Sequence, residues 1–402
     1  MSVTRTLLAA FALLAAAVAL AIEYGATQGT LLMLGAALGL TLFHASFGFA
    51  GAFRRLLSDG RGVGLRAQMV MLGVAVILFL PALAAGSVLG QPVRGFVFPV
   101  GVGLLVGAFI FGIGMQLGGG CASGTLYTAA GGEGLRMWIT LAAFIAGATY
   151  AAYDAERWTE WPSLPAVSLP ERFGTPGAVL LSFAVFATVW FVSKAVERRR
   201  YGAVEALDWS GGRFLRGPWP LLWGAVALAV LNFVTLLLAG RPWAITAAFP
   251  LWGSKLVEAA GWDDPAFWLY WEDPTRTEAL LRPVLADRTT IMDLGLMAGA
   301  FLAAALAGRA ADLRLPASGP AVASLFGGLL LGYGAVLAFG CNISAYFGGI
   351  ASGSLHGWVW IVPALLGNWV GLRLRPIFGL GGAARETPLP RGAVAGESAS
   401  PR

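Results

Sequence analysis

Cysteine and histidine are scarce in this sequence, whose 402 residues include two of each. Two cysteines exclude a disulfide-rich scaffold and a zinc site built from cysteine clusters. With His44 and His356 as the only imidazoles, a transition-metal site lacks ligands, so we expect no metal and no cofactor. The sequence also lacks the GxxxxGK[ST] motif of ATP-binding loops, so we do not expect ATP hydrolysis to drive its activity.

Charge is also scarce. Charged residues make up 12% of the chain, whereas 57% of the residues are hydrophobic and the mean hydropathy is +0.74. One water-soluble core cannot bury so much apolar surface. The 56 glycines and 15 tryptophans are typical of closely packed membrane helices and of side chains at the lipid headgroups. The composition therefore predicts an all-α polytopic membrane protein.

Apolar stretches long enough to cross a hydrocarbon core of about 30 Å predict about ten spans. They cover residues 6–22, 29–52, 67–85, 96–117, 135–153, 177–193, 219–239, 289–308, 320–340 and 355–372. If the N-terminus and the C-terminus are both cytoplasmic, 19 of the 27 lysine and arginine residues lie inside, as the positive-inside rule requires. The net charge of +6 then reflects topology, and we expect no nucleic-acid partner.

The two cysteines, Cys121 and Cys341, occur in segments that align without a gap. Between residues 107–147 and 327–367, nine of 41 positions are identical, including both cysteines and the glycine before each of them. Internal duplication predicts a shared role for the two thiols near a symmetry axis. Because an odd number of spans separates the starts of the two units, the second unit is expected to be inverted relative to the first.

The duplication divides the chain into five parts. We expect an N-terminal helix at 1–28, a first membrane repeat at 29–153, a segment of outside loop, linking helix and cytoplasmic loop at 154–218, a second, inverted repeat at 219–374, and a disordered cytoplasmic tail at 375–402. Two polar segments, residues 154–176 and 261–288, are both expected outside. Inverted repeats are a recurring architecture of transporters and channels, in which the permeant site lies between the repeats.

Glycine-rich breaks precede both cysteines. Consecutive glycines permit positive φ and close approach of the backbone to a ligand, and the apolar stretch after each cysteine is too short to span a membrane. We therefore expect a re-entrant half-helix after each cysteine, whose N–H groups and positive dipole end suit an anion. The candidate substrate-binding residues are Cys121, Cys341, Gly119, Gly120, Ser123, Gly124, Thr125, Gly340, Asn342 and Ser344.

The chemistry of a protonated thiol fits the same ligand. A thiol can donate a weak S–H hydrogen bond to a soft, polarisable anion, whereas a thiolate would repel it. A buried cysteine is commonly a small packing residue, but its repetition in the same glycine-rich setting favours a function. Asp293 lies within about a turn of the outer end of its span, and we expect it at the membrane interface.

These residues resemble a known family. GGGCASG at 118–124 and FGCNIS at 339–344 are similar to the paired signatures of the YeeE/YedE sulphur-transport family. FGFAGAFR at 47–54 and PWAIT at 242–246 look like its second pair of helix breaks. The resemblance covers most of residues 29–374, and the two cysteine motifs are its most specific part.

The resemblance implies a bacterial inner-membrane importer of hourglass form, which is not an enzyme. It would pass thiosulfate or a related sulfur-containing anion along a path lined by Cys121 and Cys341, without covalent exchange. The resemblance also implies a TusA-like sulfur carrier protein as a cytoplasmic partner. Some members carry a further cysteine on the path, which this chain lacks.

Three other functions remain open from the sequence. One is a permease for another sulfur or selenium species. Another is a membrane thiol oxidoreductase, although such enzymes usually need a vicinal or CxxC pair of cysteines. The third is a structural membrane subunit, in which the cysteines could become alanine without effect.

Overall fold

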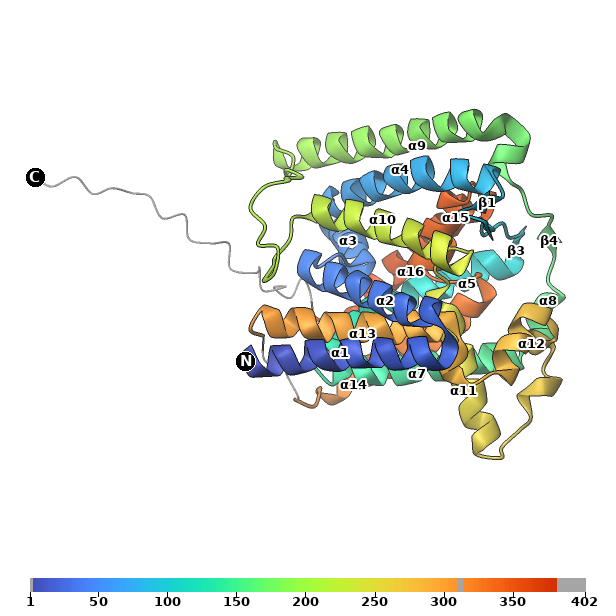
Figure 1. The fold of residues 1–402 in the computed structure, drawn as a ribbon. Coiled ribbons are helices and arrows are strands. Elements are labelled where there is room, and N and C mark those ends of the chain that lie inside the picture. The colour runs from blue at the N-terminus through green and yellow to red at the C-terminus, as the bar shows by residue number, and fades with distance from the viewer. Residues whose placement is uncertain (1–2, 133, 310–313, 382–402) are drawn as a thin grey trace, which may run out of the picture.

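The computed structural model describes residues 3–132, 134–309 and 314–381 (Figure 1). Most of the tail expected at 375–402 lies outside these residues. Its first part forms a short 3₁₀-helix, η7 (Arg375–Phe378).

Helices dominate the described residues, and the few strands are two residues long. The first half contains α1 (Val3–Tyr24), α2 (Ala26–Ala45), α3 (Phe49–Arg54), the π-helix η1 (Arg55–Asp59), α4 (Val63–Ala84), β1 (Ser87–Val88), β2 (Gln91–Pro92), β3 (Val100–Gly101), α5 (Val102–Gly118), α6 (Ala122–Ala130), α7 (Arg136–Tyr153), α8 (Ala155–Thr159), β4 (Ser163–Leu164) and α9 (Leu169–Tyr201).

The second half begins with α10 and ends with η7. It contains α10 (Leu221–Ala239), η2 (Ile245–Ala247), α11 (Ala248–Ala259), η3 (Pro265–Phe267), η4 (Leu269–Glu272), α12 (Pro274–Leu281), η5 (Val284–Ala286), α13 (Arg288–Leu306), α14 (Ser318–Leu337), the π-helix η6 (Asn342–Phe347), α15 (Gly348–Ala351), α16 (Leu355–Leu374) and η7. Strands β1 and β2 form one antiparallel pair, and β3 and β4 form another.

The predicted fold class is confirmed, because nine helices of the described chain are long and apolar enough to cross a membrane. The remaining predicted span, 135–153, forms helix α7 but is not among the nine. Helix α7 is 18 residues long, so a window of that length must include Arg136 and both of its tyrosines, which lower the mean hydropathy. A stretch that is marginal by hydropathy can still fold as a packed helix, because its neighbours bury it.

Two long helices cover the outside of the bundle and present apolar side chains outward. In α1, Phe11 is 71% exposed, and in α9, Leu180 is 72% exposed. Only 11% of the most apolar window of α1 and 17% of that of α9 is buried within the chain. Exposed apolar surface of this extent fits contact with lipid.

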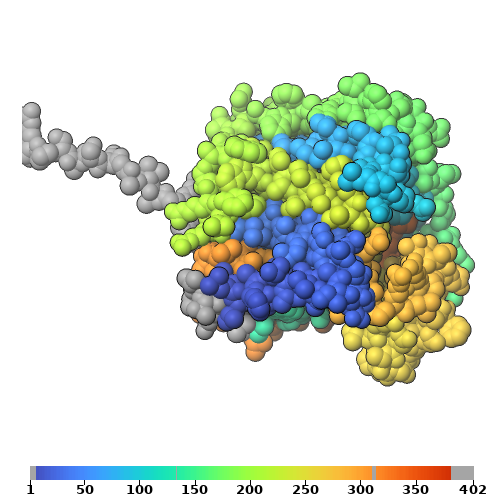
Figure 2. Space-filling view, in the orientation of Figure 1, coloured from blue at the N-terminus to red at the C-terminus, as the bar shows by residue number. Residues whose placement is uncertain are grey.

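The connections between helices gather at two ends of the bundle. Figure 1 shows α8, β4 and α12 at one end, and the start of α1 and the connection from α9 to α10 at the other. In Figure 2 the segment around α12 projects from the end of the bundle at which it lies. The two polar segments expected on one side of the membrane therefore lie at the same end of the molecule.

Glycines bring the long helices into backbone contact. A Cβ on Gly39 of α2 would lie 2.0 Å from the carbonyl oxygen of Leu296 in α13, and one on Gly299 would lie 1.9 Å from the carbonyl oxygen of Ala36. No side chain fits at such distances. Small residues that allow close approach replace the hydrophobic effect as the basis of helix association in lipid.

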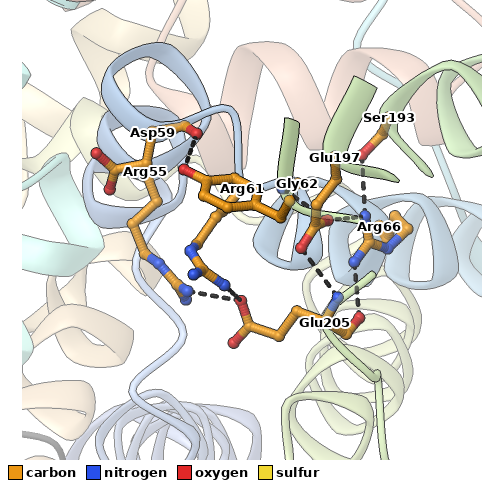
Figure 3. A network of polar contacts seen from close by, with 9 residues as sticks. Arg55, Asp59, Arg61, Gly62, Arg66, Ser193, Glu197 and Glu205 are labelled. Atoms are coloured by element: carbon orange, nitrogen blue, oxygen red, sulfur yellow. Dashed lines mark hydrogen bonds and ion pairs between the residues drawn. The ribbon is translucent and has the colours of Figure 1, made fainter. Parts of the chain in front are cut away.

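A buried ion pair attaches the outer helix α9 to α4 (Figure 3). The guanidinium of Arg66 donates to Glu197 at 2.7 Å and to Ser193 at 3.1 Å, and the side chains of Arg66 and Glu197 are 2% and 1% exposed. The second carboxylate oxygen of Glu197 accepts from the backbone N–H of Glu205 at 2.9 Å. The Glu205 side chain pairs in turn with Arg55 at 2.7 Å, so the connection after α9 is held against the segment that follows α3.

We predict that Gly39→Ala lowers the free energy of unfolding by about 1–3 kcal/mol, because the new methyl group would overlap the Leu296 carbonyl. Gly103→Ala in α5 is the matched control. Its Cβ would lie 3.6 Å from the nearest atom, an ordinary contact, so its stability should stay within about 1 kcal/mol of wild type. Thermal unfolding in detergent measures both, and equal midpoints would contradict the close packing of α2 on α13.

We predict that Arg66→Met is more damaging, by about 3–5 kcal/mol, because it leaves Glu197 buried without its cation. The double variant Arg66→Met with Glu197→Gln should recover most of the lost stability. An unfolding midpoint of the double variant no higher than that of Arg66→Met would show that the ion pair is not the cause.

Candidate functional site

The first cysteine lies at a break between α5 and α6. Helix α5 ends at Gly118, and Gly119 then adopts a φ of 96°, a left-handed value that favours glycine. Cys121 has an extended backbone and occupies the N-cap of α6. Its side chain is buried, with Sγ 3.4 Å from the Oγ of Ser123. The predicted break and the short helix after it are both present.

The second cysteine lies at a sharper break. Phe339 and Gly340 adopt φ values of 58° and 133°, and a Cβ on Gly340 would lie 2.1 Å from the Oγ of Ser344. Cys341 then caps η6, which continues into α15. Stretches of π-helix are rare and often lie at functional sites.

Side chains complete the cap of η6. The backbone N–H of Cys341 donates to the Oγ of Ser344 at 3.0 Å, and the N–H of Ile343 donates to the Sγ of Cys341 at 3.3 Å. The hydroxyl of Ser344 also lies 3.8 Å from that sulfur. The thiol sulfur therefore takes the place of the side-chain oxygen that usually caps a helix.

The fold brings the two breaks together. Both α6 and η6 contact η2, and the Oγ1 of Thr246 in η2 lies 3.4 Å from the Oγ of Ser344. Both cysteines are buried and belong to the main hydrophobic cluster of the bundle. Sequence reasoning identified a helix break at 242–246 but did not include Thr246 in the site. No local signal in the sequence places this residue beside Ser344.

Polar atoms beside the cysteines lack protein partners. Among the described residues, the Oγ1 of Thr125 and both amide atoms of Asn342 are buried without a hydrogen bond. Both residues are 0% exposed. Burying unpaired polar groups is costly, so such groups usually bind water or a polar ligand. Of the predicted site residues, these two have the clearest capacity to bind something beyond the protein.

The carboxyl end of α5, just before Cys121, is surrounded by arginines. Arg136 donates to the carbonyl of Leu117, and Arg375 donates to the carbonyl of Gln116 at 2.8 Å. Arg54 donates to the side-chain oxygen of Gln116 at 3.1 Å. These groups satisfy carbonyls that the helix end leaves unpaired, and they give this approach to the site a positive field that attracts anions.

Asp293 is buried between helices. Its side chain is 0% exposed, and its Oδ1 accepts a hydrogen bond of 3.2 Å from the Nε1 of Trp243. The interfacial depth expected from the sequence stays a prediction, because burial identifies the neighbours of a side chain and not its depth in the membrane.

Comparison with known proteins gives a family match over most of the chain. The family model described as sulphur transport matches residues 44–370. A thiosulfate transporter, TsuA, of Spirochaeta thermophila is 27% identical over 352 residues, which is 84% of this chain and 96% of the relative. The TsuA of Escherichia coli K12 is 27% identical over 358 residues, with 84% and 92% coverage.

A second type of relative matches a smaller part. The probable transporter YedE of Escherichia coli K12 is 34% identical over 163 residues, which is 40% of this chain and 39% of the relative. The aligned region therefore spans about two fifths of that relative's length. The resemblance noted from the two cysteine motifs is confirmed by these matches.

We predict that Gly340→Ala disrupts the second break, because its methyl group would overlap the cap formed by Ser344 and because its φ is unfavourable for alanine. We expect a loss of about 2–3 kcal/mol in stability and faster alkylation of Cys341. Gly124→Ala is the control, since its Cβ would lie 3.7 Å from the Sγ of Cys121, within ordinary contact distance. If Gly340→Ala and Gly124→Ala had the same unfolding midpoint and the same rate of Cys341 alkylation, the tight packing at Gly340 would be contradicted.

Proposed function

The chain belongs to the sulphur transport family, and from this premise we propose that it imports thiosulfate or a related sulfur-containing anion across the bacterial inner membrane. The matches to two thiosulfate transporters over more than four fifths of this chain support the choice of substrate. The observation that carries the proposal is the pair of buried cysteines, each at the start of a short helix, in one cluster.

We propose that the two repeats, 29–153 and 219–374, are inverted relative to each other. Helices α5 and α14 hold corresponding positions in the two repeats, and they pack antiparallel. Gly107 near the start of α5 lies against Gly334 near the end of α14, whereas Gly114 lies against Gly327. Helix α5 packs on α16 while α14 packs on α7, and α13 packs on α2 while α10 packs on α4. Such reciprocal contacts are expected of two units related by a twofold axis in the membrane plane.

The substrate path in this proposal runs between the repeats. The half-helices that begin after Cys121 and Cys341 would direct their N–H groups toward the anion. Irregular backbone at membrane depth is tolerated only where it is buried or lines a cavity. The proposed substrate-binding residues are Cys121, Cys341, Gly119, Gly120, Ser123, Gly124, Thr125, Gly340, Asn342 and Ser344, to which we add Thr246.

The thiols would act as hydrogen-bond donors and not as nucleophiles. Each buried cysteine could offer its S–H to an oxygen or to the terminal sulfur of thiosulfate, and release it as the anion moves on. No bond to the anion forms or breaks, so the protein would not be an enzyme. A thiol oxidoreductase would need the cysteines to exchange electrons with a carrier, and neither thiol reaches the surface.

The orientation and partner belong to the same proposal. The end of the molecule that holds the start of α1 and the connection from α9 to α10 would face the cytoplasm (Figure 1). We propose the same side for the C-terminal tail. Arg54, Arg136 and Arg375 would then lie on the exit side of Cys121 and draw the anion inward. A TusA-like sulfur carrier protein could receive the product there.

We predict that Cys121→Ala and Cys341→Ala each reduce thiosulfate uptake by about 10-fold or more, the effect of losing a hydrogen bond to a charged group. The serine variants should retain more uptake, because a hydroxyl also donates. Uptake of labelled thiosulfate is measured in cells without other importers, and growth on thiosulfate as sole sulfur source provides a second readout. Thr188→Ala, an exposed position on α9, is the control and should transport normally.

The double alanine variant decides the role of the thiols. Undiminished uptake of thiosulfate by this variant would remove them from the path. Retained uptake of sulfide or selenium species, with loss of thiosulfate alone, would support thiosulfate as the substrate.

A further inference from the structure

Asp293 is a buried acid that the proposed path does not use. It lies in the spanning helix α13, five residues after the helix begins at Arg288, and is therefore about 7 Å along its axis. Its Oδ1 accepts the Trp243 N–H, whereas its Oδ2 has no partner in the described chain. Ionisable groups inside a membrane are functional by default, because their burial is costly.

In the part of the chain that the structure describes, no cation pairs with this carboxyl group. Its Oδ1 accepts from Trp243, and Asp287 caps the same helix six residues earlier. Arg241 interacts with Asp287 and donates to Thr289, and Arg288 donates to the carbonyl of Ala239. The two arginines near the start of α13 therefore bond to groups other than the Asp293 carboxyl.

The elements packed around α13 are α1, α2, α6, α11, η2 and η5. Their titratable side chains within the described residues are those of Glu23, Tyr24, His44, Tyr127, Lys255 and Glu258, and Cys121 caps α6. Lys255 and Glu258 pair with each other at 3.1 Å.

A short chain of contacts leads from Asp293 to the second cysteine. Trp243 precedes η2, whose Thr246 lies 3.4 Å from the Oγ of Ser344. Ser344 caps the helix that begins at Cys341. Helix α13 also contacts both η2 and α6 directly. A change at the carboxyl group can therefore alter the position of η2 between the two breaks.

The corresponding position in the first repeat is neutral. Asp293 is the sixth residue of α13, and Gln68 is the sixth residue of α4. Gln68 is also buried, and its Oε1 also lacks a partner. The second repeat thus carries a carboxyl group where the first carries an amide, so only one of the two positions can bind and release a proton.

We propose that Asp293 is the proton-binding site that couples anion uptake to proton entry, a proposal that rests on the proposed function. The carboxylate would take a proton from the outside, the substrate anion and the proton would cross together, and the proton would leave to the cytoplasm. Thiosulfate carries two negative charges. A membrane potential of about 100 mV, negative inside, lowers the equilibrium ratio of inside to outside concentration by about 50-fold for each charge. One co-transported proton removes one of these two penalties, and the chain has no ATP-binding motif to supply the energy otherwise.

The test uses the full-length protein in liposomes with the membrane potential clamped at zero. When an inward proton gradient is imposed, wild type should accumulate labelled thiosulfate inside the liposomes. For a 10-fold proton gradient, the ratio of inside to outside thiosulfate should rise to about 10. The interior should also become more acidic as thiosulfate enters. Asp293→Asn should keep exchange of labelled for unlabelled thiosulfate at zero gradient but lose proton-driven accumulation. Asp293→Glu should restore part of this accumulation.

Control variants separate coupling from structure. Gln68→Asn changes the corresponding amide and should keep the ratio of proton-driven accumulation to exchange. Trp243→Phe keeps the ring but removes the N–H, and should shift the pH dependence of accumulation without abolishing exchange.

Several outcomes would overturn the inference. These are wild-type uptake without proton movement, proton-driven accumulation by Asp293→Asn equal to wild type, or loss of both exchange and accumulation in a folded Asp293→Asn. If Asp293→Asn does not fold, the proton movement of the wild type and the pH shift of Trp243→Phe decide the question. Failure of the wild type to exchange thiosulfate at all would instead refute the proposed function.

Discussion

The structure depends on one constraint, which is that every backbone N–H and C=O group within a membrane needs a partner. Two helix breaks expose such groups in the middle of a spanning bundle, and the chain compensates both. At the end of α5, Arg136 and Thr140 bond the carbonyls of Leu117 and Gly118. At the start of η6, Ser344 accepts the N–H of Cys341. Among the described residues, side-chain atoms of Thr125 and Asn342 beside the breaks remain without partners, as our proposal for anion binding requires.

Glycine lets the helices pack closely while their backbone N–H and C=O groups stay paired. The reciprocal contacts of α5 with α14 and of α2 with α13 rely on glycine facing backbone carbonyl oxygens, where a Cβ would lie within 3 Å. The buried Arg66–Glu197 pair then fixes the outer helix α9 to this tightly packed bundle. The breaks can therefore persist because the helices around them have little freedom to close over them.

Composition and hydropathy predicted the fold class, and the duplicated glycine–cysteine motif predicted both breaks. They did so because lipid imposes a simple requirement on length and polarity, and because glycine marks positions of positive φ, as Gly119 and Gly340 illustrate. The contacts between distant elements could not be predicted in this way. Thr246 contacts Ser344, which lies 98 residues later in the chain, and Asp293 accepts a hydrogen bond from Trp243, which lies 50 residues earlier. A pattern in one sequence shows which residues share a face of a helix, but it does not show which distant element that face contacts.

The two breaks share a motif but differ in chemistry. The sulfur of Cys341 accepts the backbone N–H of Ile343 and lies near the Ser344 hydroxyl, whereas that of Cys121 lies beside the Ser123 hydroxyl. The contact of Thr246 with Ser344 and the carboxyl group of Asp293 also lie on the side of the second repeat. In our proposals, the second repeat therefore carries both a substrate-binding break and the proton site, whereas the first repeat carries a break without a carboxyl group.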